Sequence, residues 1–413
     1  MSLAEVLRQA LRLLAAHRLR SLLTLFGVVW GTAAVIFLVS WGQGVRVMLE
    51  DGFFKAGKNM GEVWAGKIGE DYTPAVDRRY LWFRNEDVEA LRRRAKLPEI
   101  VGAEFWSFQP VTSGARAFSV DLRGLDPEAV AVRGVPVDAG RAIRTADLEH
   151  RRRVVVLGHT ARRRLLGPEG GVGSWVRIAG TPFRVIGVLA RVGTQLSRDR
   201  MEIDEQAWVP ITTAQALWPP WWTQEPVVHK IIYRMKSRHW LEATESEVRG
   251  ILARQLRVSP GDHEAIGIWS SVRNLQQLPL DEMRGTLLVL AIAVLVIGGV
   301  GVLNMMLDSV HERRQEIGVR RAVGARRRDV VVQFFLETFT VTSVGGGVGA
   351  ALGVLGTRAL AAVDAPDLVP VPIFGWGIVA VAVGVMLSVG LLAGVVPAWR
   401  ASRIEPAETL RME

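Results

Sequence analysis

Cysteine is absent from this 413-residue sequence. Disulfides, thiolate nucleophiles and thiolate metal sites are therefore excluded, and any part in an oxidising compartment must be held by packing alone. A phosphate loop of the Gly-x-x-x-x-Gly-Lys-Ser/Thr type is also absent, so the chain cannot by itself hydrolyse ATP through such a loop. The seven histidines are scattered, and no spacing of Ser, His and Asp indicates a nucleophilic site. We predict a protein without catalytic residues, metal or cofactor of its own.

One incomplete motif does not change this expectation. His311 and Glu312 begin like a zinc-protease helix, in which a second histidine follows one turn later. Position 315 is Gln315, so that second metal ligand is missing.

Glycines recur every four residues in one apolar stretch, at Gly345, Gly349 and Gly353. Gly345 and Gly347 also mimic a dinucleotide fingerprint, but no strand precedes them. Small residues at a spacing of four lie on one helical face, where they let two helix backbones approach closely in lipid. The predicted helix-packing residues are Gly27, Gly31, Gly345, Gly349 and Gly353.

Charged residues are missing from four windows that are long enough to cross a bilayer, which needs roughly 20 apolar residues per helix. A cleaved signal peptide is a poor explanation for the first window, because a charged leader precedes it and its apolar core is too long. The windows are Ser21 to Val45, Gly285 to Leu307, Thr338 to Thr357, and Leu368 to Trp399. The predicted transmembrane helices cover 21–45, 284–309, 330–358 and 370–398.

Arginine placement predicts the orientation, because short cytoplasmic loops carry an excess of Lys and Arg. Four arginines lie in the leader and seven lie between 313 and 328, whereas the loop after the third window holds one arginine and two aspartates. The net charge of +10 then reflects membrane flanks, so membrane lipid is an expected partner and nucleic acid is not. The expected cytoplasmic parts are an amphipathic elbow helix over 1–20, a coupling loop over 310–329 and a tail over 399–413, and the external parts are 46–283 and the loop 359–369.

The external region has the pattern of a mixed α/β domain. Two strand–helix–strand units, at 62–111 and 229–269, bracket a central stretch with short β signals and glycine turns. We predict an α/β subdomain from 46–115 and 225–283, with a β-rich subdomain over 116–224 inserted into it. The predicted fold class is thus an α-helical membrane domain of four transmembrane helices, with a mixed α/β external core domain inserted between helices 1 and 2.

A tryptophan cluster, Trp218-Pro219-Pro220-Trp221-Trp222, stands out in the central stretch. One interpretation is a contact surface for an external partner or substrate. The other, which we favour, is an aromatic plug of the inserted subdomain.

Several segments resemble those of MacB-like and FtsX-like ABC transporter permeases. The stretch Arg313 to Ala325 resembles the coupling segment of that family, and Pro397 to Leu410 resembles its C-terminal signature. Trp399 departs from the family, in which smaller residues are common at this position. The resemblance covers essentially the whole chain, with one span before the external domain and three after it. Further similar stretches are Arg18 to Thr24, Val39 to Gly44, Gly140 to Asp147, Val155 to Gly158 and Val185 to Val188.

The resemblance implies the membrane subunit of a bacterial ABC system in the inner (cytoplasmic) membrane, with both termini cytoplasmic and a MacB-like periplasmic core domain. It implies a dimer with a second permease copy or paralogue, and a separate ABC ATPase subunit that binds ATP and Mg. It also leaves room for a periplasmic adaptor and an outer-membrane duct. The residues that it assigns to ATPase coupling are Glu316, Ile317, Gly318, Arg320, Arg321 and Gly324.

The residues of the coupling segment agree with docking to a protein. Ile317, Val319 and Val323 supply an apolar edge, while Glu316 and the neighbouring arginines can meet charges on a partner. A solvated loop that binds lipid headgroups explains the composition equally well. The resemblance favours docking.

The expected function is to couple ATP hydrolysis by the partner to movement of the external domain, for export of a substrate from the periplasm. The alternatives are a lipoprotein-release permease and an FtsX-like, signal-transmitting subunit that controls a cell-wall hydrolase. The large two-part external domain favours export, because a smaller domain is expected for signalling.

Overall fold

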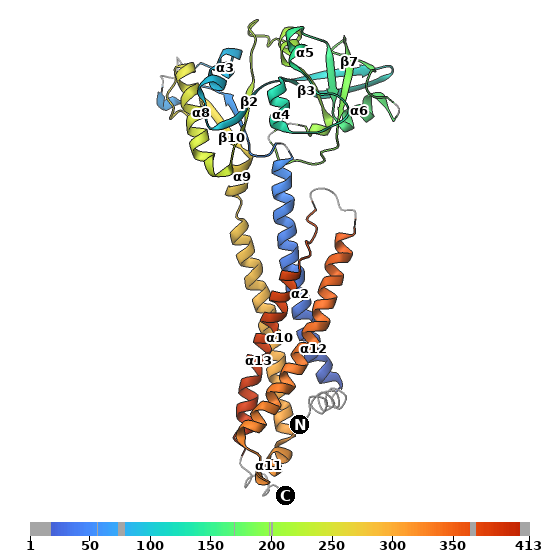
Figure 1. The fold of residues 1–413 in the computed structure, drawn as a ribbon, viewed down its shortest axis with the longest axis vertical. Helices are drawn as coiled ribbons and strands as arrows, with labels where there is room; N and C mark the ends of the chain where they lie inside the picture. The colour runs from blue at the N-terminus through green and yellow to red at the C-terminus, as the bar shows by residue number, and fades with distance from the viewer. Residues whose placement is uncertain are drawn as a thin grey trace. The chain divides into compact units, whose positions relative to one another are not determined.

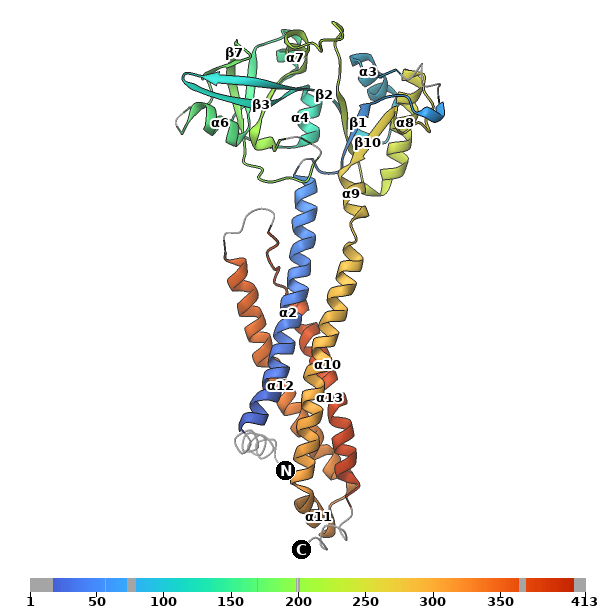
Figure 2. The same cartoon turned by 180° about the vertical axis from the view of Figure 1, so that it is seen from behind.

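The computed structural model describes residues 18–55, 57–72, 79–168, 170–197, 199, 201–363 and 369–404. The elbow helix predicted over 1–20 lies outside these residues except for its last three positions, and the predicted tail is described as far as Ile404. The chain forms two compact units. The membrane unit comprises Met1–Met48 and Pro279–Glu413, and the external unit comprises Leu49–Leu278. Each unit is described by itself below (Figures 1 and 2).

Among its described residues, the membrane unit contains four helices that are long and apolar enough to cross a membrane. A short helix, α11 (Arg314–Ala322), lies between the second and the third of them. The four helices run beyond the charge-free windows, because hydropathy marks the part that crosses the hydrocarbon whereas helical hydrogen bonding continues into the charged flanks. They are α2 (Arg18–Phe54), α10 (Leu280–Glu312), α12 (Arg327–Ala361) and α13 (Trp376–Ser402).

The external unit is built on one mixed sheet, in the strand order β10-β1-β9-β2-β3-β8-β5-β7-β4, with β6 pairing β2 and β7. The strands are β1 (Met60–Ala65), β2 (Pro98–Ser113), β3 (Arg116–Leu125), β4 (Val137–Gly140), β5 (Val154–Leu157), β6 (Trp175–Ile178), β7 (Thr181–Leu189), β8 (Gln206–Pro210), β9 (Lys230–Met235) and β10 (Ile266–Ser270). The helices are α3 (Asn85–Arg94), α4 (Pro127–Arg133), α5 (Thr145–Glu149), α6 (His159–Leu166), α7 (Ile211–Leu217), α8 (Leu241–Leu256) and α9 (Ser271–Gln277). Short 3-10 turns lie at Glu70–Tyr72, Ile203–Glu205 and Arg238–Trp240.

Both predicted strand–helix–strand units are present, as β1–α3–β2 and β9–α8–β10. Their helices α3 and α8 lie beside β1 and β10 in both views (Figures 1 and 2). The long strand β2 belongs to both predicted pieces of the external region, because its first half pairs with β9 and its second half with β3. One hydrogen-bonded sheet therefore runs through both pieces. Together with the four membrane-spanning helices, this mixed α/β unit confirms the predicted fold class.

The tryptophan cluster divides between core and surface. Trp218 is half-buried and stacks on Phe183, with 5.8 Å between the ring centroids. Trp221 is 90% exposed, and Trp222 lies on the surface against Trp82 with a centroid distance of 4.8 Å. The favoured plug interpretation is correct for Trp218 and wrong for the other two tryptophans. The proline pair between them carries the chain out of the core.

Candidate functional site

The inner face of α11 packs on its own membrane unit. Ile317 and Gly318 are its buried residues. The Ile317 side chain is 6% exposed and lies in an apolar cluster contributed by α10, α12 and α13. The other members of that cluster are Val310, Val330, Phe334, Ala398, Ala401 and Ile404. Two of the predicted coupling residues therefore hold α11 in place and are not available to a docked protein.

Polar contacts also fasten α11 to α12. Arg313, between α10 and α11, donates from Nη1 to Glu337 Oε1 at 3.1 Å, and the Glu337 side chain is 3% exposed. Gln333 donates to the same carboxylate at 3.4 Å and accepts a hydrogen bond from Arg320 Nη1 at 3.0 Å. One connected chain of hydrogen bonds thus links both ends of α11 to one face of α12. A buried pair of this kind resists separation, because removing one partner leaves the other charge uncompensated.

A second arginine contact fastens α11 to the end of α13. Arg321 Nη1 donates to the backbone oxygens of Ser402 and Ile404, at 2.9 Å each. The last carbonyls of a helix have no partner within the helix, and a cation there also meets the negative end of the helix dipole. Arg320 and Arg321, predicted to meet charges on a partner, are thus engaged within the chain itself.

The outer face of α11 is exposed. Glu316 is exposed and pairs with Arg320 one turn away. Val319 is 50% exposed and Val323 is 84% exposed. Gly324 follows with a φ of +107°, a conformation that favours glycine and ends the helical segment. The predicted coupling residues therefore fall into two groups. Glu316 and Gly324 are exposed, whereas the others are buried or hydrogen-bonded to α12 and the end of α13.

The predicted glycines of α12 face α2. A Cβ on Gly345 would lie 2.7 Å from Val28 Cγ1, and one on Gly349 would lie 2.4 Å from the Val29 carbonyl oxygen. Gly353 has a looser contact, at 3.1 Å from Ile36 Cβ. We call these three glycines with the facing residues of α2 the α2–α12 seam.

The predicted glycines of α2 face a different neighbour, α10. A Cβ on Gly27 would lie 3.8 Å from the Gly298 Cα, and one on Gly31 would lie 3.6 Å from the Val294 carbonyl oxygen. Both distances correspond to ordinary van der Waals contact. Helix α2 therefore lies between α12 and α10 and contacts them through different residues.

A third close contact was not predicted. A Cβ on Gly390 of α13 would lie 2.2 Å from Thr342 Cγ2, and one on Gly394 would lie 2.8 Å from Thr338 Oγ1. Both threonine hydroxyls donate to backbone carbonyls of the preceding turn, and the two threonine side chains fill the space left by the glycines. The available signal was the matching spacing of four on both helices.

The external unit contains a buried group of ionisable side chains that sequence reasoning missed. Its members come from β1, β2, β3, the end of α4, the loop after β7 and β9, and all but Lys230 are at most 3% exposed. We call it the ion cluster: Glu62, Glu104, Asp121, Arg123, Arg133, Asp199 and Lys230.

Two arginines at the centre of the ion cluster bind the same carboxylates. Arg123 pairs with Glu104 and contacts Asp199 at 3.1 Å, while Arg133 contacts Glu104 at 2.7 Å and Asp199 at 2.9 Å. Burial by itself would raise the pKa of Glu104, but Arg133 and Arg123 hold it below its usual value. The same arginines lower the pKa of Asp199 against the effect of its burial. Both carboxyls are therefore ionised, and they connect strands of both predicted pieces.

Glu62 lies at the edge of the ion cluster and behaves differently. Burial raises its pKa, which the ammonium of Lys230, at 2.9 Å, offsets only in part. Its Oε1 atom has no hydrogen-bond partner among the described residues. The cluster thus holds more carboxyls than cations, and Glu62 is the carboxyl that gains least from being ionised.

Two families match the chain. The family described as MacB-like periplasmic core domain matches residues 21–251, and the family described as FtsX-like permease C-terminal matches residues 288–406. The first match covers more than half of the chain, and the second runs from within α10 to just beyond the end of α13.

Similar proteins cover the whole chain. It is 29% identical over 99% of its length to the macrolide export ATP-binding/permease protein MacB of Bdellovibrio bacteriovorus, covering 62% of that protein. It is 32% identical over its whole length to the MacB protein of an Azoarcus species, covering 60% of it. The chain thus spans about three fifths of these relatives. It is 26% identical to the uncharacterised ABC transporter permease YknZ of Bacillus subtilis, with 100% of both chains covered.

Solved structures of external domains are also similar to part of the chain. The extracellular domain of YknZ from Gram-positive bacteria matches 51% of this chain and 100% of that chain, with 17% identity and a TM-score of 0.41. The periplasmic region of MacB from Actinobacillus actinomycetemcomitans matches 54% of this chain and 93% of that chain, with 18% identity and a TM-score of 0.43. The two family matches over residues 21–251 and 288–406 decide the assignment: the chain belongs to the family of ABC transporter permeases with a MacB-like periplasmic core domain and an FtsX-like C-terminal domain.

Proposed function

We propose that this permease couples ATP hydrolysis on a separate ATPase subunit to movement of its external domain, which exports a substrate from the periplasm. The observation that carries the proposal is the two-sided character of α11. Its inner face is fastened to α12 and α13, and its outer face presents Glu316, Val319 and Val323. A helix with these two faces can receive a displacement from a docked protein and pass it to the spans.

The route from α11 into the spans follows the closest contacts. Helix α12 receives the displacement through the hydrogen bonds of Arg313 and Arg320. Its glycines contact the backbone of α2 so closely that one helix cannot shift without the other. Chain continuity then carries the movement outward, since α2 ends at Phe54 within the external unit and α9 precedes α10.

The remaining parts of the proposal follow from the family. The permease forms a dimer with a second copy or a paralogue, and the ATPase subunits bind ATP and Mg. The arginines around α11 and in the leader support cytoplasmic termini, by the rule that cytoplasmic loops are positively charged. A periplasmic adaptor and an outer-membrane duct would complete an export path across both membranes.

The docking surface is tested with full-length variants purified together with the ATPase of the native membrane. Glu316→Arg reverses a charge on the exposed face of α11, and Val323→Asp places a charge where a valine is 84% exposed. Both should lower ATPase recovery and the ATPase stimulation by the permease at least tenfold, because an unpaired charge in a protein interface costs several kcal/mol.

The matched control is Arg327→Asp, at an exposed position of α12 beyond α11. It changes a cytoplasmic charge without touching the outer face of α11, so ATPase recovery should equal that of the unmodified chain. Full recovery and stimulation in both α11 variants would contradict docking at this face. Equal losses in all three variants would point to a general loss of folding or assembly, and the docking proposal would be abandoned.

A further inference from the structure

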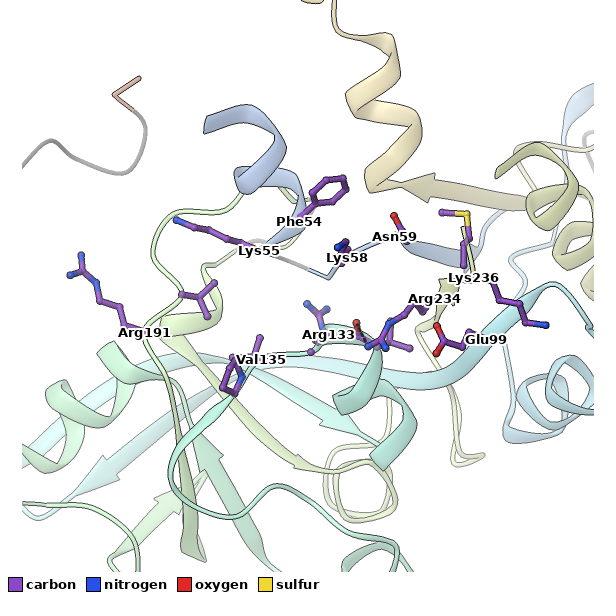
Figure 3. A pocket seen from close by; sticks show the side chains of 15 residues that line it. Phe54, Lys55, Lys58, Asn59, Glu99, Arg133, Val135, Arg191, Arg234 and Lys236 are labelled. Carbon is purple, nitrogen blue, oxygen red and sulfur yellow. Dashed lines mark hydrogen bonds between the residues drawn. The ribbon is translucent and has the colours of Figure 1, made fainter. Parts of the chain in front are cut away.

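A pocket of about 550 Å³ lies within the external unit (Figure 3). Its walls come from the end of α2 and the turn before β1, the segment after α4, the loop after β7 and the end of β9. This volume is in the range of pockets that hold small ligands. We call it the basal pocket, because the first span leads directly into its wall at Phe54.

Positive charge dominates the lining of the basal pocket. Lys58, Arg191, Arg234 and Lys236 line it, and no ion pair joins them to a carboxylate among the described residues. Glu99 is the acidic residue of the lining. Figure 3 shows Arg191 on one side of the pocket, and Lys236 with Glu99 on the other. Cations held around one concave surface raise the local concentration of anions.

Two of these cations are held in place by backbone carbonyls. Arg234 donates from Nη2 to the carbonyl oxygens of Ala131 and Val132 at the end of α4. Lys236 Nζ donates to the Lys96 carbonyl oxygen at 2.9 Å. A guanidinium has five N–H donors and an ammonium has three, so both side chains keep donors for a ligand. Neutral carbonyls position these cations without cancelling their charge.

Arg133 also lines the pocket but has a different role. Its side chain is fully buried, and its guanidinium is taken up by Glu104 and Asp199 of the ion cluster. The charge of Arg133 is therefore neutralised by these two carboxylates. The charge available to a ligand therefore belongs to the exposed Lys58, Arg191 and Lys236 and to the half-buried Arg234.

We propose that the basal pocket binds a phosphate group. Several separate cations around one concave site suit an anion with several oxygens, and arginine binds phosphate oxygens in a two-pronged geometry. Phe54, Val135 and Met235 add an apolar part to the lining, against which the carbon skeleton of a phosphate ester can pack. The ligand class is an organic phosphate with a short apolar portion.

An anionic phospholipid is the source of phosphate that chain connectivity favours. Phe54 follows Val45, the last residue of the first uncharged window, by nine residues. Nine residues reach at most about 30 Å even when fully extended, so the covalent chain keeps the pocket near the membrane surface. Lysines and arginines close to anionic headgroups each contribute roughly 1 kcal/mol at the membrane surface. A soluble phosphate ester is the other source of the same chemistry.

Hydrogen exchange of the full-length chain in neutral detergent tests the proposal, because it separates this pocket from the cytoplasmic arginines. Phosphatidylglycerol, phosphatidylcholine and glycerol phosphate are added in parallel. Phosphatidylglycerol should protect the peptides that cover 132–136 and 234–236, and phosphatidylcholine should protect them much less. Protection by glycerol phosphate at similar concentration would assign the site to a soluble ester instead.

In the double variant Lys58→Glu/Lys236→Glu, the phosphatidylglycerol concentration that gives half of the maximal protection should rise roughly tenfold to thirtyfold. The matched control is Arg153→Glu/Arg163→Glu, which makes the same change of charge at two exposed positions outside the pocket. It should bind like the unmodified chain. Equal binding by both double variants, or equal protection by phosphatidylcholine and phosphatidylglycerol, would overturn the proposal.

Discussion

The α2–α12 seam is tested most directly by adding one methyl group. A Cβ on Gly349 would lie 2.4 Å from the Val29 carbonyl oxygen and 2.8 Å from Thr32 Cβ, whereas ordinary contacts begin at 3.4 Å. Both obstacles belong to or lie next to the backbone of α2, which cannot rotate away as a long side chain can. Gly349→Ala therefore requires the two helices to separate by about 3.4 − 2.4 = 1.0 Å at this point.

The magnitude follows from a comparison with Gly347, two residues earlier on the same helix. A Cβ on Gly347 would meet nothing within 4 Å, so Gly347→Ala gains only the helix preference of alanine, up to about 1 kcal/mol. Gly349→Ala makes the same gain and also overpacks the seam, which costs about 1–3 kcal/mol. The free energy of unfolding should therefore be about 1–3 kcal/mol lower for Gly349→Ala than for Gly347→Ala. Gly349→Leu should increase the difference.

The cysteine-free sequence makes the assay clean. Single cysteines introduced in α2 and α12 carry a donor and an acceptor dye, and energy transfer between them reports separation of these two helices. Unfolding by a denaturing detergent then gives the free energy for each variant on an identical labelled background. Equal unfolding free energies for the two alanine variants, or an unchanged value for Gly349→Leu, would show that α12 does not contact α2 through Gly349.

Three further substitutions test contacts within the two units. Glu337→Ala should destabilise the membrane unit by about 3–5 kcal/mol in the same assay, because Arg313 loses its buried carboxylate; Glu337→Gln, which keeps an acceptor, should cost less, and equal costs would contradict an ion pair. Burial would raise the pKa of Asp199 but Arg133 lowers it, so its contribution to stability is complete above the unfolded pKa and is lost as pH falls below about 4. Asp199→Asn should therefore flatten the pH dependence of the external unit's melting temperature below pH 4, and an unchanged slope would refute this assignment. Burial raises the pKa of Glu62, so its ionisation lowers the stability of the folded state instead of raising it. Glu62→Gln should therefore preserve the melting temperature at pH 4 and should not lower it at pH 8. A marked drop at pH 8 would show an ionised, stabilising carboxylate.

The sequence alone determined the membrane spans, because the absence of charge over some 20 residues is a local property that a bilayer requires. It also determined the two strand–helix–strand units, since the side-chain pattern within each segment predicts the element without knowledge of its neighbours. The spacing of Gly345, Gly349 and Gly353 indicated a packing face for the same reason. The matching spacing on α13, at Gly390 and Gly394, was missed because it becomes informative only when Thr338 and Thr342 are known to face it.

Tertiary structure alone decided which face of each element is used. The residues of α11 that resemble a docking motif proved to be divided, with Ile317 and Arg321 turned toward α12 and α13. The ion cluster joins residues as far apart in sequence as Glu62 and Lys230. The sequence around either residue does not indicate which residue it pairs with. Trp218 and Trp221 differ in burial although three positions separate them. Local sequence specifies periodicity and charge, whereas burial and pairing depend on which distant segments the fold brings together.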